Sequence, residues 1–521
     1  EFEFALLHHA SGLDEAGAAR AVESLARRRI LHSVGERLDF THDRVREVVY
    51  GLILPARRVP LHRRVAEALA DVHAGDLAPH HLAIGLHYFE AQVWDEAAAH
   101  LRRAGARALR RYAMRDAIAC FERALAAIGR LPQDRAALEH AFDIWLESRP
   151  PFNQLGENRE VLRVLAEAGA IADRLGDERR RARVEAFMTV AHTQLGDLDE
   201  AVASGTRARQ AALRLGDLDL RIVATDILLQ TLVHRGEHER VIELAADNVA
   251  AVPPERVNES FGRFAPPAIY SRISLVRSLA ELGRLDEASR FADEAIGLAD
   301  PTRHAYSIGM AHWTAGMLDV ARGDWARARA RIEHGIAALR TAGASLAMPW
   351  GLASAAWALA QLGRADEALA CLVESEQLAA GLATRGAPGG AQGTRLHALG
   401  RASLALGRLD EAQRLGERAV EASTHQPAYA AHAWHLLGDV AAHANGFDGE
   451  RGLACYREAP ERAEPRGMRP LIAHCHLGIG RVNRGLGRRR TADKHLARAS
   501  ALYRDMGLSY WLDRPEAQRR S

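Results

Sequence analysis

The feature that most constrains the fold is a motif that returns along the chain at a nearly constant spacing. The heptapeptide LGRLDEA occurs at 282–288 and again, letter for letter, at 406–412. Looser copies surround both, and each copy carries one glycine; these are Gly156, Gly196, Gly236, Gly283, Gly323, Gly363, Gly407, Gly446 and Gly487. Successive glycines are 40, 40, 47, 40, 40, 44, 39 and 41 residues apart. Such a steady period predicts stacked copies of one supersecondary unit.

Each repeat unit is predicted to be a pair of helices. Leu275 and Leu282 precede Gly283 at the spacing of one apolar helix face. The glycine suits the left-handed position that ends a helix. Asp286 and Glu287 then place negative charge in the first turn of the next helix, where the helix dipole favours it. No stretch of the repeat region alternates with the period of a strand, so this region is predicted to be all-α.

Three segments interrupt or imitate the pattern. The two longest steps contain the proline- and glycine-rich segments 251–267 and 381–393, which are predicted to be loop insertions. Residues 341–363 carry no charge. They are rich in alanine rather than leucine and contain Pro349, so we expect a buried helix of the array rather than a membrane span.

The first part of the chain departs from the repeat. Residues 11–29 are predicted to form a capped amphipathic helix, and 30–34 and 37–40 to form two short strands about a tight turn. A further helix is predicted to start at Thr41, a good N-cap residue. Helix, hairpin and helix together indicate a winged-helix unit.

Composition and missing motifs argue against catalysis in this chain. The only lysine, Lys494, lies outside any G-x-x-x-x-G-K-[ST] frame, so the chain by itself is not a P-loop nucleoside triphosphatase (NTPase). The sequence contains no HExxH or GxSxG motif and no zinc-spaced cysteine pairs, so we expect neither a metal site nor a catalytic nucleophile. The formal charge of +2 gives no pull toward nucleic acid. Arginine runs at 27–29, 179–181 and 488–490 lie beside acidic residues and are interpreted as solvated helix ends.

Two further observations concern the setting of the chain. The four cysteines are far apart, which favours reduced thiols and a cytoplasmic protein. The chain begins EFEFALLHH, without a methionine or a signal peptide, and we expect it to be a fragment of a longer protein.

Over about 155–510 the repeat resembles the tetratricopeptide repeat (TPR), in its longer-helix variants found in bacterial signalling ATPases and regulators. The segments FTHDRVREVVY (40–50), LPARRVPLHRRVAEAL (54–69) and HHLAIGLHYFEAQVWDEAAAHLRRAG (80–105) resemble the part that follows the nucleotide-binding core of bacterial STAND/AAA-type ATPases. RDMGLSYWLDRPEA (504–517) resembles the end of such chains. In that family a P-loop ATPase precedes a winged helix and a TPR superhelix. Adenylate or guanylate cyclase, protein kinase or LuxR-type DNA-binding domains are fused at one end.

The resemblance implies an all-α, TPR-like α/α superhelix of helix-pair repeats with a small N-terminal winged-helix unit that contains a short β-hairpin. The predicted parts are 1–75, the winged-helix-like end of an ATPase module; 76–130, a helical connector; and 131–521, the superhelix. It also implies that ATP or ADP binds a missing upstream domain, which this chain contacts intramolecularly. His42, in THDR, matches a histidine that approaches the bound ADP. The alternative is that His42 only caps and packs at the helix start.

In a TPR superhelix the first helix of each pair lines the groove, which is the default site for a protein partner or small effector. The candidate groove residues are Tyr270, Arg272, Arg277, Tyr306, His312, Trp313, Trp350, Trp357, Trp434 and His435. The chain is thus predicted to be the non-catalytic sensor or protein-interaction arm of a signal-transduction ATPase. Two alternatives stay open: a free-standing TPR scaffold for protein assembly, and a transcriptional regulator whose winged helix contacts DNA.

Overall fold

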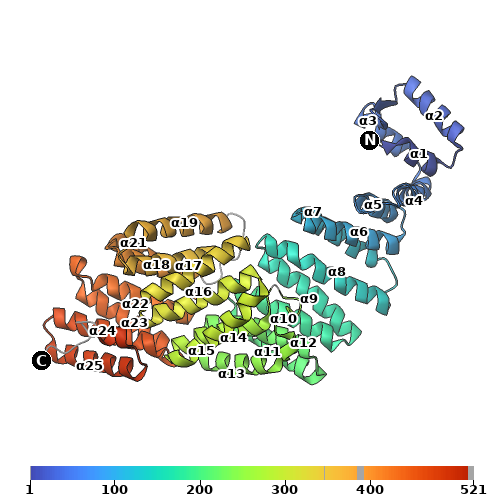
Figure 1. Ribbon diagram of the computed structural model, residues 1–521. Coiled ribbons are helices and arrows are strands. Elements are labelled where there is room, and N and C mark those ends of the chain that lie inside the picture. The colour runs from blue at the N-terminus through green and yellow to red at the C-terminus, as the bar shows by residue number, and fades with distance from the viewer. Residues whose placement is uncertain (1, 264, 345–346, 384–391, 514–521) are drawn as a thin grey trace. The chain divides into compact units, whose positions relative to one another are not determined.

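The computed structural model describes residues 2–263, 265–344, 347–383 and 392–513 (Figure 1). The chain forms two compact units, Glu1–Asp177 and Glu178–Ser521. This division falls within 131–521, away from the predicted boundaries at 75/76 and 130/131. Among the described residues, no helix is both long enough and apolar enough to cross a membrane.

The first unit begins with a small sheet and continues as helices. Its elements are β1 (Phe2–Glu3), α1 (Phe4–Ser11), α2 (Glu15–Arg27), β2 (Leu31–Val34), β3 (Arg37–Phe40), α3 (Asp43–Leu52), α4 (Pro55–Val72), α5 (His81–Glu90), α6 (Trp94–Arg110), α7 (Met114–Ile128), α8 (Arg135–Gln154) and α9 (Asn158–Leu175). The predicted hairpin is present as β2 and β3, which pair antiparallel with Leu31 opposite Phe40. The short strand β1, which the sequence did not indicate, pairs antiparallel with the other edge of β3.

Two predicted helix starts in this unit were wrong. The helix predicted to start at Thr41 begins at Asp43, and the N-cap residue is His42, whose side chain makes no capping bond. The Thr41 hydroxyl instead donates to the carbonyl oxygen of Arg29 at 2.7 Å, which ties the helix start to the end of α2. The helix predicted over 11–29 is the shorter α2, where the Asp14 carboxylate accepts the cap bond from the Gly17 amide at 2.8 Å.

The second unit is a TPR-like superhelix of helix pairs. Its helices are α10 (Glu178–Leu195), α11 (Leu198–Leu215), α12 (Leu218–Arg235), α13 (His238–Ala251), α14 (Pro267–Glu281), α15 (Leu285–Ala299), α16 (Ala305–Arg322), α17 (Trp325–Thr341), α18 (Met348–Gln361), α19 (Ala365–Ala383), α20 (Gln392–Ala405), α21 (Leu409–Ala422), α22 (Pro427–Ala441), α23 (Gly449–Ala463), α24 (Arg469–Gly485), α25 (Arg489–Asp505) and α26 (Ser509–Leu512). Short 3₁₀ helices cover Pro254–Arg256, Asp300–Thr302, Ala444–Gly446 and Glu464–Arg466. The 251–267 segment is largely the predicted loop, whereas most of 381–393 lies outside the described residues.

The repeat glycines end helices in the left-handed conformation, as predicted. Gly283 has a φ of 77°, and seven of the other eight motif glycines also have positive φ. Gly446 is the exception, because it closes a 3₁₀ turn. The period-40 pattern therefore reflects one backbone requirement that recurs in almost every unit.

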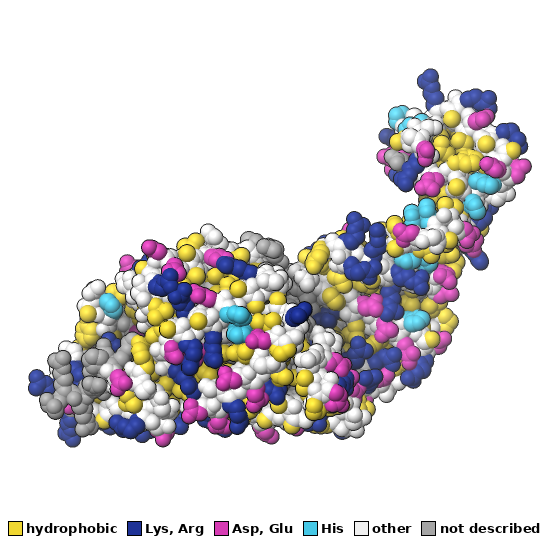
Figure 2. Space-filling view, viewed as in Figure 1, with side chains coloured by type: hydrophobic (Ala, Val, Ile, Leu, Met, Phe, Trp, Pro, Cys, Tyr) yellow, Lys and Arg dark blue, Asp and Glu magenta, His cyan; other side chains and the backbone are white. Residues whose placement is uncertain are grey.

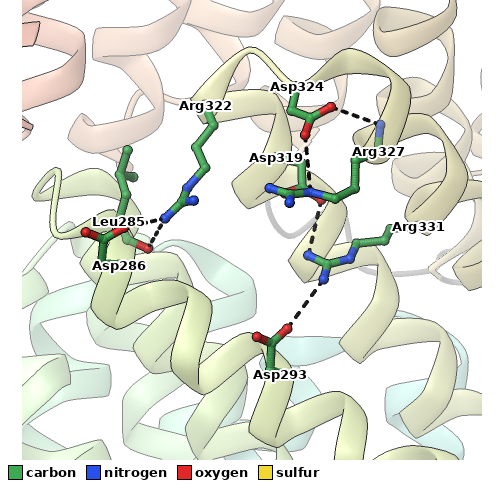
Figure 3. A network of polar contacts seen from close by, with 8 residues as sticks. All are labelled: Leu285, Asp286, Asp293, Asp319, Arg322, Asp324, Arg327 and Arg331. Atoms are coloured by element: carbon green, nitrogen blue, oxygen red, sulfur yellow. Dashed lines mark hydrogen bonds and ion pairs between the residues drawn. The ribbon is translucent and has the colours of Figure 1, made fainter. Parts of the chain in front are cut away.

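Ion pairs between residues 36 or 38 positions apart recur along the array and join neighbouring repeat units. Figure 3 shows one such network on α15–α17, where buried Asp319 accepts from Arg327 at 2.7 Å and from Arg331 at 3.2 Å. Arg331 also reaches Asp293, 38 residues earlier, at 3.4 Å. Similar pairs explain why dark blue and magenta side chains intermingle on the face shown in Figure 2. Exposed pairs of this kind add little stability individually.

The superhelix completes a turn within the second unit, so later helix pairs pack on earlier ones. Helix α22 lies against α12, and α24 lies against α14. At Gly236 a Cβ would lie only 2.8 Å from the Cβ of Ala428, and at Gly323 it would overlap the ring of Tyr510. The indole Nε1 of Trp511, on α26, donates to the carbonyl oxygen of Ala321 at 3.1 Å. The C-terminal helices therefore close the inner face of α12–α16.

Candidate functional site

Between these packed turns lies a partly open cavity of about 580 Å³ inside the second unit. Its lining comes mainly from the first helices of the pairs, α14, α16, α18, α20, α22 and α24, and from Trp511 of α26. Such a volume is typical of small-molecule sites, which measure roughly 300–1,000 Å³.

Aromatic side chains form much of the cavity wall. The tryptophans that line it are Trp313, Trp325, Trp350, Trp357 and Trp511. Trp350 and Trp357 lie seven residues apart on α18, a spacing that places both on the same helix face. The indole Nε1 of Trp313 donates to the Ser354 hydroxyl at 3.1 Å, which fixes the ring across the α16–α18 gap. The wall is therefore apolar with oriented polar edges.

One polar cluster joins α14 to α22 on opposite sides of the closed turn. Both carboxylate oxygens of Glu281 lie 3.1 Å from Nε2 of His432. Burial would raise the pKa of Glu281, but the charge and hydrogen bond of His432 outweigh it and hold the pKa at about 2. One turn before Glu281, the Arg277 guanidinium donates to the phenol oxygen of Tyr429 at 2.9 Å.

A second polar cluster lies between α20, α22 and α23. The Asp439 carboxylate accepts hydrogen bonds from the Arg401 guanidinium and from the Tyr456 hydroxyl. His435 Nδ1 is 3.8 Å from the same carboxylate. Burial opposes ionisation of Asp439, yet His435 and Arg401 hold its pKa well below the usual range. Both carboxylates of the cavity are consequently ionised and engaged at neutral pH.

Three histidines in the lining, His397, His435 and His474, are held in their neutral form. Burial lowers the pKa of His435 to about 4, even though Asp439 favours its charged form. Burial and the nearby Arg401 or His435 also lower the pKa values of His397 and His474 well below the ordinary range. The His474 ring hydrogen-bonds the Tyr503 hydroxyl at 2.6 Å. These imidazoles act as hydrogen-bonding groups rather than as cations near pH 7.

The arrangement is suited to binding. Burial raises the pKa of the Cys475 thiol, so this cysteine is not an activated nucleophile. Among the residues that the structure describes, no three histidine, cysteine or carboxylate side chains converge at metal-binding distance.

Five of the candidate groove residues are brought together in the cavity lining: Arg277, Trp313, Trp350, Trp357 and His435. Several partners of these residues escaped the sequence reasoning, namely Glu281, Arg401, His432, Asp439 and Arg481. Helical spacing carries a signal for some of them, since Glu281 lies four residues after Arg277 and Asp439 four after His435.

The other five candidates lie in other surroundings. Tyr270 and Tyr306 stack on one another with ring centroids 6.3 Å apart. Arg272 donates to Glu294 at 2.9 Å, and His312 bonds Asp300 at 3.1 Å. The ring of Trp434 lies 5.9 Å from the Arg462 guanidinium carbon. None of the five lines the cavity described here.

His42 is exposed at the start of α3, and its side chain makes no capping bond there. Helix α3 buries none of its residues. A role of His42 near a nucleotide stays a prediction.

Comparison with known proteins gives no family assignment. No family model matches the chain, and no curated protein matches it. Among solved structures, the chain is similar to the apo form of RapI, with 10% identity, a TM-score of 0.47, and coverage of 70% of this chain and 97% of that one. It is also similar to a Rap protein complexed with competence and sporulation factor, with 11% identity, a TM-score of 0.43, and coverage of 79% and 99%. It is similar as well to the APC/C hetero-tetramer Cut9-Hcn1, with 12% identity, a TM-score of 0.40, and coverage of 99% of this chain and 98% of that one.

Proposed function

We propose that the protein is the sensor arm of a signalling protein and binds a small effector in the cavity of the second unit. The observation that carries this proposal is the closure of the superhelix around a volume of about 580 Å³. A ligand bound between α14–α16 and α22–α26 would stabilise the contacts between successive turns and report its presence through them.

The first unit supports a role as the contact to a further domain. The apolar side chains Val48, Val49, Leu52 and Leu54 of α3 and the following turn are 57%, 40%, 78% and 67% exposed. An amphipathic helix whose apolar face is bare marks an interaction surface. In our proposal this face packs on an ATPase domain that binds ATP or ADP, with His42 at the junction, and the output follows the nucleotide state.

The cavity is tested with phenylnaphthylamine, a neutral dye that fluoresces in apolar sites, and with the variant Met317→Trp. Met317 lines the cavity and is only partly buried, so a larger ring at this position takes up ligand volume. We expect one dye per chain and at least tenfold weaker binding to the variant. The matched control is Val373→Trp on the exposed side of α19, which places the same ring outside the cavity.

Equal dye binding by both variants would show that the cavity is not the binding site and would favour the free-standing scaffold. The link to an ATPase is tested separately by the intact mass of the native polypeptide. A mass well above the 56.9 kDa of this chain, together with nucleotide binding, is the expected result.

A further inference from the structure

The charges of the cavity are not balanced. Its lining contains four arginines, Arg277, Arg395, Arg401 and Arg481, but only two carboxylates, Glu281 and Asp439. The formal sum over these arginines and carboxylates is therefore four minus two, or +2. In a site walled by aromatic rings, this excess acts on a ligand more strongly than it would in water.

Both carboxylates already have partners inside the wall. Asp439 accepts from Arg401 and Tyr456, and Glu281 is bonded to His432. The Arg277 guanidinium donates a hydrogen bond to the phenol of Tyr429, and its charge also favours the ionised form of Glu281. These pairings leave no carboxylate free to neutralise a further cation.

Two arginines of the lining keep unused donors. Among the described residues, Arg481 has no hydrogen bond or ion pair; it is exposed to solvent and lies on the face of α24 that carries the lining residues His474 and Gly478. Arg395 is 5% exposed, and its Nη1 has no hydrogen-bond partner in the described part of the chain. The buried Nη1 of Arg395 is costly without a partner, and an anionic acceptor relieves that cost best. The exposed Arg277 and Arg481 contribute positive charge to the same lining.

The side chains of the cavity wall indicate the chemistry of the uncharged part of the ligand. The five tryptophans offer ring faces and edges at which a flat apolar body packs well. The neutral histidines add acceptors and donors without adding charge. A cation would meet the excess of guanidinium groups, and a strongly polar ligand would leave the indole faces without contact.

We propose that the effector is a small organic anion: an aromatic or otherwise flat apolar body that carries a carboxylate, sulfonate or phosphate group held by Arg481 and Arg277. This inference rests on the proposed function, because it specifies the chemistry of the ligand for that same cavity.

The test compares two dyes that differ by one anionic group. Anilinonaphthalene sulfonate is phenylnaphthylamine with one added sulfonate group. Both are titrated into the full chain, into Arg481→Gln, into Arg277→Gln and into Arg490→Gln, with folding checked by circular dichroism. Arg490 is an exposed arginine at the start of α25, outside the cavity lining, and controls for the loss of one positive charge.

We expect Arg481→Gln to weaken the binding of the sulfonate dye about tenfold, as the loss of one charge-assisted hydrogen bond implies. In Arg481→Gln the dissociation constant of the neutral dye should change less than twofold. In Arg490→Gln the dissociation constants of both dyes should stay the same. Rising salt should reduce this selectivity.

If the neutral dye binds in the cavity but Arg481→Gln and Arg277→Gln both leave the sulfonate dye unaffected, the anion assignment is overturned while the cavity site stands. An equal loss of both dyes in Arg481→Gln also overturns it, because the arginine would then act through packing. Binding of neither dye to the full chain overturns the proposed cavity site itself.

Discussion

Single buried histidines link the superhelix to pH. His234, on α12, is buried, and its ring meets the ring of Tyr429 edge-on at 5.8 Å across the closed turn. Burial, aided by the charge of Arg277, lowers the pKa of His234 to about 3. The folded pKa is then below the unfolded value of 6.5, so the unfolded chain binds the proton first as the pH falls. The contribution of His234 to stability is intact above pH 6.5 and declines toward pH 3.

The variant His234→Leu should therefore flatten the pH dependence of unfolding. Between pH 7 and pH 5 the wild-type residue accounts for a loss of about 2 kcal/mol in the free energy of unfolding. Urea unfolding at these two pH values, followed by tryptophan fluorescence, measures this difference. His9→Leu, at an exposed position in the first unit, should leave the wild-type slope unchanged. An identical slope in His234→Leu and the wild type would show that His234 does not contribute.

At the scale of elements, the glycine turns that follow the first helix of each repeat pair have two structural roles. Gly323 and Gly363 both follow the last turn of a helix, with φ of 80° and 74°. A Cβ at Gly363 would meet nothing within 4 Å, whereas a Cβ at Gly323 would overlap the Tyr510 ring. The same motif thus supplies a helix end in almost every unit and a docking point for α26 in one of them.

We expect Gly363→Ala to lower the free energy of unfolding by about 1 kcal/mol, through the left-handed backbone alone. Gly323→Ala should cost about 1–3 kcal/mol more, because the new methyl group overpacks against Tyr510. Chemical unfolding of both variants provides the comparison. Adding Tyr510→Ala to each should remove the extra loss at Gly323; if the two glycine variants are equal from the start, the close approach is not formed in solution.

The contrast between these two glycines shows what the sequence could predict. Helix pairing and the left-handed glycines depend on residues within a few positions of one another, so the repeat pattern identifies them. The approach of Tyr510 to Gly323 sums the twist of several repeats over 187 residues, and no local pattern encodes it. The same limit explains why Arg277 and Trp357 could be identified as groove candidates from helical spacing, while Trp511 and Arg481 could not. The prediction that a helix starts at Thr41 was wrong for another reason. The Thr41 hydroxyl donates its hydrogen bond to the carbonyl of Arg29, 12 residues earlier, instead of capping the helix.

At the scale of the whole molecule, the two units divide the work in our proposal. Every residue that lines the cavity belongs to Glu178–Ser521, and the exposed apolar face of α3 belongs to Glu1–Asp177. Ligand binding and domain contact are therefore separable by substitution. Leu52→Ser should leave the melting temperature of this chain within about one degree, because the side chain is already in solvent. A clear drop measured by scanning calorimetry would place Leu52 in the interior of the first unit.

The last prediction follows from the closure of the superhelix. A fragment of residues 178–521 should fold alone, because it contains its own core, and should bind phenylnaphthylamine as tightly as the full chain. A fragment of residues 178–507 lacks α26, and with it the Trp511 wall and the bond from its indole to Ala321. We expect this shorter fragment to retain its helix content by circular dichroism but to bind the dye at least tenfold more weakly. If both fragments bind equally, α26 is not part of the site, and the ligand would be held by the inner helices alone.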